Sequence, residues 1–272
     1  MNKIKITLLL LLGFGLLVAC SDDDSNSETT IAGNFFPLVV NNSWDYENTL
    51  STSTPGQDDV VTTETLSITN TSENNGNTEY ELETDNPAGS SPVTLALSQG
   101  VLSKNDASLI YTGQFGLGLT DFPEVTFDVE DVQIYNTSAS IDTELFSQNG
   151  SIQQDFQGIP ISIDYTLSSI MGDSFESFES NDVTYDNVIS SQLIINLEIT
   201  ANITDPLPLS IPILQSQDAV IVTNYFADGV GLIQSETDTN LVFEEIPIPD
   251  FTLEDISLLT LQELTDYSVS LE

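Results

Sequence analysis

Residues 183–203 read VTYDNVISSQLIINLEITANI, and this stretch decides the fold class. Leu193, Ile195, Leu197 and Ile199 occupy alternate positions, so an extended chain places all four side chains on one face. A period of two over this length is typical of a half-buried β-strand. The stretch therefore predicts a long strand with one apolar face.

Strand patterns continue on both sides of this stretch. Residues 60–71 and 78–84 flank the turn-like residues 74–77 and predict a hairpin. Helical patterns are scarce, and we favour a strand over a helix for 259–271. The other expected strands are 93–97, 101–102, 109–115, 125–135, 141–146, 152–167 as one long bent strand, 219–226, 231–236 and 240–248. Short strands with turns between them predict an all-β meander, sandwich or open barrel.

The N-terminus has the features of a secretory signal peptide. Lys3 and Lys5 precede an apolar run, and residues 6–20 span 15 positions, fewer than the roughly 18 that a transmembrane helix needs. Residues 17–20, LVAC, resemble the bacterial lipobox, which implies cleavage before Cys20 and acylation of its thiol with palmitate-type chains. The alternatives are a membrane-spanning anchor, or a secreted protein whose lone cysteine falls there by chance.

The residues directly after Cys20 resemble a second targeting signal. Ser21, Asp22, Asp23 and Asp24 are similar to the acidic tag that directs Bacteroidota lipoproteins to the cell surface. A flexible charged tether is the plainer interpretation, and the two are compatible. We expect a signal peptide over 1–19, a lipidated tether over 20–33 and a β domain over 34–272, anchored in the outer membrane at the cell surface.

The charge balance excludes several partners. The chain has 43 acidic and 3 basic residues and no histidine, for a net charge of −40. After cleavage, Lys104 is the one basic side chain, in a turn that we expect to be solvated. Nucleic-acid binding requires Lys and Arg to displace counterions, so it is excluded, and binding to anionic lipid surfaces is disfavoured. The lipid anchor is the expected membrane contact.

The composition also limits the possible chemistry. Without histidine there is no Ser-His-Asp triad, and acylation of Cys20 removes the thiol nucleophile. Paired carboxylates of the glycosidase type remain, and we expect candidate pairs to be the polar side of strands or loops: Asp128, Glu130 and Asp131, or Glu176 and Glu179. We expect no enzyme activity.

A calcium site is the one cofactor hypothesis that the sequence supports. Calcium takes oxygen ligands from Asp, Glu, Asn and carbonyl groups. Asp182, Asp186 and Asn187 lie in a loop-like stretch and are the candidate ligands, although their spacing differs from the twelve-residue EF-hand loop. Diffuse screening of the surface charge by cations is the alternative.

Three segments resemble uncharacterised Bacteroidota cell-envelope lipoproteins. Residues 36–46, FPLVVNNSWDY, resemble their aromatic-Pro-Leu and Trp-x-Tyr opening, and 225–233, YFADGVGLI, resemble their aromatic-Ala-x-Gly-Val-Gly-Leu segment. Residues 181–188 resemble the segment before their long strand. The resemblance implies an extracytoplasmic antiparallel fold, as a strongly curved sheet or half-barrel, and no activity. Gly229 and Gly231 predict a turn or bulge between strands, with a ligand loop as the alternative.

Two functional hypotheses follow, with a carboxylate-pair hydrolase third. The first is a non-enzymatic envelope lipoprotein whose β domain binds a partner or has a structural role. The second is a carrier that holds a lipid or glycan against a concave sheet, with Trp44, Tyr46 and Phe226 as candidate contacts. A filled interior favours the structural role, whereas an apolar cavity favours the carrier.

Overall fold

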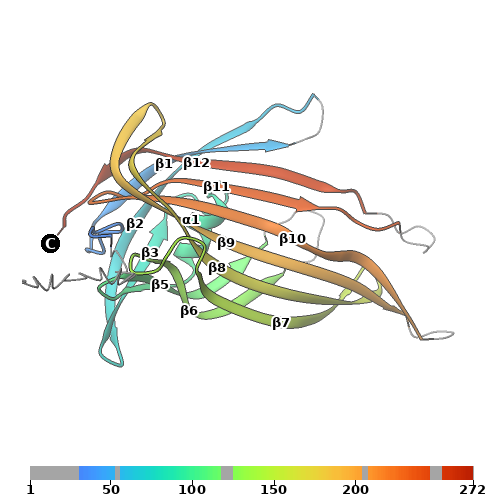
Figure 1. Ribbon diagram of the computed structural model, residues 1–272. Helices are drawn as coiled ribbons and strands as arrows, with labels where there is room; N and C mark the ends of the chain where they lie inside the picture. Colours follow the sequence, from blue (N-terminus) through green and yellow to red (C-terminus); the bar gives the residue numbers. More distant parts are fainter. Residues whose placement is uncertain (1–30, 53–55, 118–124, 204–207, 246–252, 272) are drawn as a thin grey trace, which may run out of the picture.

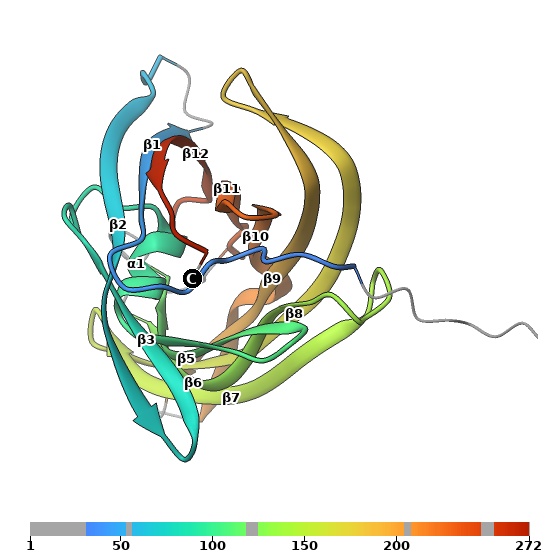
Figure 2. The same ribbon diagram turned by 90° about the vertical axis from the view of Figure 1, so that its left-hand side faces the viewer.

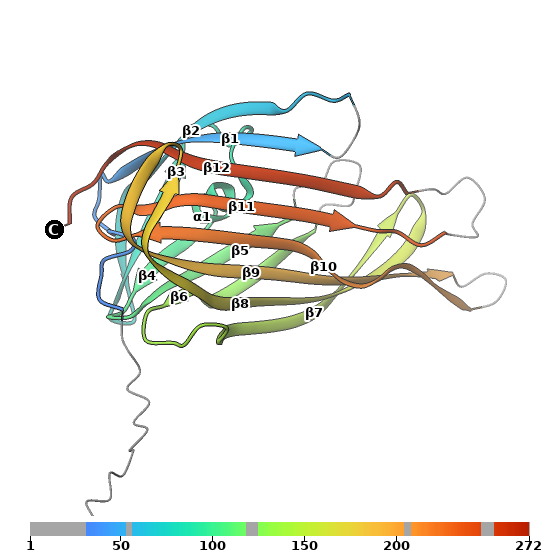
Figure 3. The ribbon, with the colours of Figure 1, turned by 45° about the horizontal axis from the view of Figure 1, so that its top comes forward.

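The computed structural model describes residues 31–52, 56–117, 125–203, 208–245 and 253–271. Cys20 and the acidic residues at 21–24 therefore lie outside the described residues. Within them, twelve antiparallel strands form a single sheet (Figures 1 and 3). The strands are β1 (Ser43–Thr52), β2 (Val60–Asn74), β3 (Asn77–Thr84), β4 (Val101–Lys104), β5 (Ser108–Gly116), β6 (Thr126–Asn136), β7 (Glu144–Phe156), β8 (Ile159–Ser180), β9 (Val183–Ile203), β10 (Leu209–Ala227), β11 (Gly231–Leu241) and β12 (Ile256–Ser268).

The sheet rolls up because its first and last strands pair with each other. The strand order is β6-β5-β4-β3-β2-β1-β12-β11-β10-β9-β8-β7, so each strand lies beside its neighbours in sequence except at β6 and β7. Pairing of β1 with β12 runs from Ser43↔Ser268 to Thr52↔Leu258. The expected single, strongly curved antiparallel sheet is thus confirmed, and a sandwich does not form.

Side chains close the seam between β6 and β7. Gln148 Nε2 on β7 donates to the backbone oxygen of Asp128 on β6 at 3.0 Å. Ser169 Oγ on β8 donates to the backbone oxygen of Gln133 at 2.6 Å. The rings of Phe127 and Tyr165 pack with their centroids 4.5 Å apart. The sheet is therefore nearly closed and barrel-shaped, and it surrounds one apolar interior.

Residues 31–42, here called the cap segment, cross one end of the rolled sheet (Figure 2). The amide of Ile31 donates to the oxygen of Thr137 at 3.0 Å. The side chains of Phe35 and Phe36 are fully buried, so they close the interior at this end. Ile31 is thus bonded to the segment that directly follows β6.

Helix α1 (Pro92–Ser98) lies inside the rolled sheet, where we expected a strand over 93–97. That prediction was wrong because a helix-capping pattern overrides the short apolar run. Ser91 Oγ accepts from the amide of Thr94 at 3.1 Å, and Pro92 stands at the start of the helix, where its missing N–H is not needed. Within the described residues, none of the helical structure has the length and apolar character that crossing a bilayer requires.

Turns account for the remaining differences and agreements between the predicted and the observed strands. The single strand expected over 152–167 is wrong, because Gln157 and Gly158 adopt positive φ angles of 54° and 82° and form the turn of the β7–β8 hairpin. The hairpin turn expected at 74–77 is confirmed, with Asn75 at φ 52°. The strand expected over 259–271 is confirmed as β12. Gly229, at φ 71°, lies in the expected turn between β10 and β11.

Candidate functional site

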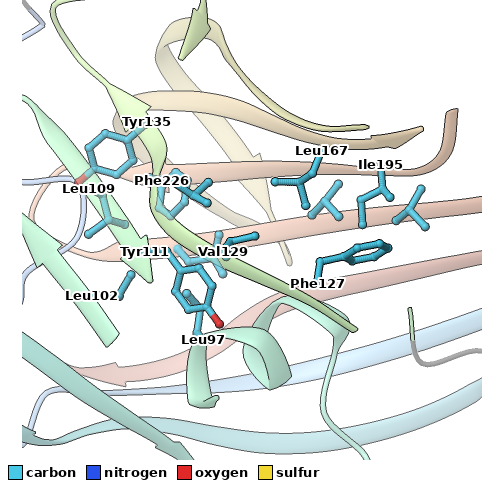
Figure 4. Close-up of a cluster of buried hydrophobic side chains, with 14 of the residues drawn as sticks. Leu97, Leu102, Leu109, Tyr111, Phe127, Val129, Tyr135, Leu167, Ile195 and Phe226 are labelled. Atoms are coloured by element: carbon cyan, nitrogen blue, oxygen red, sulfur yellow. The ribbon is translucent and has the colours of Figure 1, made fainter. Parts of the chain in front are cut away.

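A cavity of about 70 Å³ lies in the interior between α1 and the strands on the opposite wall. Figure 4 shows part of its surroundings, with Leu97 of α1, Ile195 of β9 and Phe226 of β10 among the buried hydrophobic side chains. Since one water needs about 10–15 Å³ of such space, the cavity has room for roughly five to seven water-sized groups. It is smaller than the roughly 300–1,000 Å³ of sites for drug-sized ligands, so its occupant is small.

A row of polar side chains crosses this apolar interior. Asn224 on β10 pairs in register with Ser191 on β9 and with Ser235 on β11. Ser235 pairs in turn with Gln262 on β12, and Gln262 pairs with Asn48 on β1. Residues directly opposite each other on paired strands share a face, so the five side chains form one row, here called the polar belt. All five are at most 6% exposed.

Each residue of the polar belt has a buried oxygen without a hydrogen-bond partner in the protein. The described residues contain seven buried side-chain atoms of this kind, and five belong to the belt: Asn48 Oδ1, Ser191 Oγ, Asn224 Oδ1, Ser235 Oγ and Gln262 Oε1. A buried polar group left unpaired costs about 1–3 kcal/mol, and folded proteins contain few of them. Their concentration on one row therefore requires an explanation.

The carboxylate of Glu64 explains one end of the belt. Glu64 is 3% exposed, and its Oε1 accepts from Asn48 Nδ2 at 2.8 Å, Gln262 Nε2 at 2.9 Å and the amide of Ser91 at 3.1 Å. Gln262 Nε2 also donates to Thr94 Oγ1 at 2.6 Å. Because a carboxylate accepts only, both amide nitrogens face it and both amide oxygens are turned away. This cluster holds α1 inside the sheet.

The other end of the belt borders the cavity. Ser191 and Asn224 both line it, beside the apolar side chains of Leu193, Val222 and Phe226. These positions carry a weak sequence signal, because a polar residue interrupts an alternating apolar series: Asn224 follows Val220 and Val222, and Ser191 precedes Leu193 and Ile195. Sequence reasoning missed the belt, since only the strand register shows that the interruptions coincide.

The interior carries negative charge and no positive charge within the described residues. Glu64 is the one buried acid there, and Lys104 is the one basic side chain. Lys104, at the end of β4, is exposed as expected, and it also donates from Nζ to Asn34 Oδ1 of the cap segment at 2.5 Å. Burial lowers the pKa of Lys104, and the nearby carboxylate of Asp228 raises it.

Two buried tyrosines border this interior and remain neutral. Burial raises the pKa of Tyr46 well above its usual value, and the carboxylate of Glu64 raises it further. Its hydroxyl donates to the backbone oxygen of Leu232 at 2.9 Å. Burial also raises the pKa of Tyr135, whose hydroxyl has no partner in the protein. Neither phenol supplies a charge to a ligand in the interior.

The structure separates the aromatic residues proposed from the sequence as ligand contacts. Phe226 lines the cavity. Trp44 and Tyr46 are buried in the core instead, and Trp44 donates from Nε1 to the backbone oxygen of Val230 at 2.7 Å while packing on Phe36 with centroids 4.8 Å apart. The segments 36–46 and 225–233 therefore pack against each other at one end of the sheet.

The proposed calcium ligands are not gathered into one site. Asp182 lies in the turn between β8 and β9, and Asp186 lies four residues further along, about 13 Å away in an extended strand. Asn187 Nδ2 donates to the oxygen of Ala32 and to Asp228 Oδ2 at 3.1 and 3.2 Å. No group of three or more Asp, Glu, His or Cys that would suit a metal ion is found in the described part of the chain.

The carboxylates considered for hydrolysis face solvent. They are exposed on β6 and on the β8–β9 hairpin: Asp128, Glu130, Asp131, Glu176 and Glu179. Asp128 Oδ1 is already engaged, since it accepts from Gln114 Nε2 at 2.7 Å. These carboxylates therefore do not line the interior cavity.

Comparison with known proteins does not assign this chain to a family. No known protein family and no characterised protein match the sequence. A LolA superfamily protein from Nitrosomonas europaea aligns over 86% of this chain and 88% of its own, at 9% identity and a TM-score of 0.18. At that score, no relationship of fold or function follows.

Proposed function

We propose that the protein is a lipid-anchored envelope protein whose rolled sheet binds a small, mainly apolar molecule in its interior cavity. One observation carries this proposal: the interior cavity is lined mainly by apolar side chains, with a few polar residues such as Ser191 and Asn224 in its wall. A ligand with an apolar body and one polar group would fill this space. Ligand sites combine apolar walls with a few placed polar groups in this way.

The same geometry supports binding over hydrolysis. Hydrolysis by a carboxylate pair needs two carboxyl groups facing each other across the substrate, about 5–9.5 Å apart. Among the described residues the interior holds Glu64 alone, and three donors already engage its Oε1. Within the described residues, Glu64 therefore has no second buried carboxylate to act with, and its contacts serve to hold α1 in place.

Binding in the cavity can be tested with 1-hexanol, whose size suits the available space. The full-length chain in nanodiscs is labelled at its Val, Leu and Ile methyl groups, and the NMR signals of Val222 and Leu193 are followed during titration. Val222→Phe fills the cavity and should abolish the shift of the remaining reporter, Leu193. Ile221→Phe, one residue along β10 and on the opposite face, is the matched control and should preserve the shifts. Absence of saturable shifts in the wild type would refute the proposal.

The lipid anchor and the surface location are a separate part of the proposal. They rest on the apolar leader, on Cys20 after Leu17-Val18-Ala19, and on the acidic residues at 21–24. Palmitate labelling of cells that express the wild type or Cys20→Ala should label the wild type alone. Digestion of intact cells with protease should then remove the labelled protein. Labelling of the variant, or full protection from protease, would contradict the anchor or the surface location respectively.

A further inference from the structure

We infer that the end of the rolled sheet closed by the cap segment lies on the surface of the bilayer that holds the lipid anchor, with Tyr267 and Leu271 in contact with lipid. This inference rests on the anchor in the proposed function and is independent of binding in the cavity. It draws on the distribution of charge between the two ends of the sheet, on the apolar side chains exposed at the cap end and on the length of chain between the anchor and the sheet.

The cap end is built from three segments that contain no charged residue: 31–44, 229–235 and 267–271. Hydrogen bonds join these segments. Trp44 Nε1 donates to the backbone oxygen of Val230 at 2.7 Å, which connects the first segment to the second. Asn42 Nδ2 donates to the backbone oxygen of Ser270 at 2.9 Å, which connects the first segment to the third. Segments that are far apart in the sequence therefore form a mainly uncharged end face, in a chain whose net charge is −40.

The other surfaces of the sheet carry carboxylates. Three adjacent pairs are exposed at the opposite end, next to the ends of β1, β11 and β12: Asp58 with Asp59, Glu244 with Glu245, and Glu254 with Asp255. Carboxylates are also exposed along the outer side of the sheet, such as Glu47 on β1 and Glu236 on β11. Moving a charged group from water towards hydrocarbon costs more than moving a neutral one. The cap end is therefore the surface that can approach a bilayer at the lowest cost.

Large apolar side chains are exposed at the uncharged end. Tyr267, near the end of β12, is 45% exposed, and Leu271, close to the C-terminus, is 58% exposed. Val39 of the cap segment is partly exposed and lines the same surface groove as Leu271. Tyrosine combines an apolar ring with a polar tip and is enriched where a membrane meets water. These side chains therefore suit contact with the boundary between lipid headgroups and acyl chains.

The length of chain between the anchor and the sheet excludes the inverted orientation. Ile31, at the cap end, stands 11 positions after Cys20, so it lies at most about 40 Å from the anchored residue at roughly 3.6 Å per residue. From Ala227 at the cap end to Leu209 at the opposite end, β10 extends about 60 Å at roughly 3.3 Å per residue (Figure 3). With the opposite end on the bilayer, Ile31 would stand further from the lipid than this chain length allows.

The contact can be tested with a fluorophore on the full-length lipidated chain in phosphatidylcholine nanodiscs. Since acylation occupies the sulfur of Cys20, a cysteine introduced elsewhere is the one free thiol to label. Leu271→Cys reports on the cap end, and Leu209→Cys, at a position of similar exposure (55%) at the opposite end, is the matched control. Lipid spin-labelled near its headgroup should quench at least about half of the emission at position 271, because interfacial side chains enter this region by about 5–10 Å. Emission at position 209 should not change.

A second pair of substitutions tests the role of the uncharged surface. In the Leu271→Cys chain, Tyr267→Asp should reduce the quenching by at least about twofold, because it brings a charge to the lipid contact. Leu259→Asp, on the same strand at a position 41% exposed, should leave the quenching unchanged.

The outcomes separate the inference from the proposed anchor. If the palmitate-labelled protein remains with the nanodiscs but position 271 is not quenched, or position 209 is quenched equally, the anchor stands and the inference is overturned. The inference is also overturned if Tyr267→Asp behaves like Leu259→Asp. If the protein separates from the nanodiscs and takes up no palmitate, the anchor fails and the inference fails with it.

Discussion

Replacing the unpaired serines of the polar belt by alanine should stabilise the unliganded protein. Ser191 and Ser235 are 1% and 2% exposed, and neither Oγ has a partner in the protein. In the unfolded chain water hydrates both hydroxyls, so folding strips each of its hydrogen bonds. Removing a penalty of this kind, about 1–3 kcal/mol per group, should increase the free energy of unfolding by at least about 1 kcal/mol for each substitution.

The two gains should add. Ser191 and Ser235 flank Asn224 on the strands to either side of β10, which places them about 9.6 Å apart at roughly 4.8 Å per strand. Sites separated in this way without a shared partner behave independently. The double variant should therefore gain about 2 kcal/mol. For a domain of this size, that corresponds to a rise in melting temperature of about 4–8 °C.

Ser169→Ala is the matched control for this experiment. Ser169 is also an inward-facing serine, 1% exposed, but its Oγ donates to the backbone oxygen of Gln133 across the seam at 2.6 Å. Its loss should lower stability by about 0.5–1.5 kcal/mol. Urea unfolding at constant m-value measures all four variants. If Ser191→Ala and Ser235→Ala are destabilised as Ser169→Ala is, their hydroxyls are paired in solution and the reasoning fails.

Four further predictions concern the rest of the molecule. Lys104→Met removes the donor to Asn34, so hydrogen exchange in the cap segment should accelerate while global stability falls by less than about 1 kcal/mol; unchanged exchange would contradict the role of this contact. Gly231→Ala brings a Cβ to 2.8 Å from Trp44 Nε1 at a φ of 120°, and urea unfolding followed by tryptophan fluorescence should show a loss of more than about 1 kcal/mol. Burial raises the pKa of Tyr111 to about 12, from 10.0 in the unfolded chain, so its contribution to stability is complete below pH 10 and is lost as the pH rises through 12; Tyr111→Phe should flatten this part of the stability–pH curve. With a net charge of −40, the melting temperature should rise with NaCl, and a flat response would show that self-repulsion is unimportant.

The strands could be predicted because an alternating apolar pattern indicates a strand with one buried face, whichever strands lie beside it. Leu197 and Ile199 are fully buried, as their alternation requires, and a one-residue slip would expose the whole face. Closure of the sheet could not be predicted, because the pairing of β1 with β12 joins residues more than 200 positions apart and leaves no local pattern. The resemblance to curved-sheet lipoproteins, not the periodicity, implied a strongly curved sheet.

Local chemistry caused the errors at short segments. The run at 93–97 is too short to distinguish a strand from a helix by apolar spacing, and the decisive signal was Ser91 followed by Pro92, a pair that starts helices. The turn at Gln157 and Gly158 was hidden inside an apolar alternation that continues on both sides of it. In both cases one or two residues determine the local structure, and a prediction from apolar spacing does not take those residues into account.

The two ends of the polar belt have different surroundings. Asn48 and Gln262 use their amide nitrogens to hold Glu64, so their unpaired oxygens are the by-product of a structural contact. Ser191 and Asn224 lie in strands that place apolar residues at the adjacent inward positions, and both line the cavity. Ser235 lies between Ile233 and Thr237 on β11 and is not among the residues that line it. Apolar side chains at Ser191 and Ser235 would remove two unpaired hydroxyls and give a more stable interior. The proposed binding in the cavity gives the polar residues in its wall a role that packing alone does not.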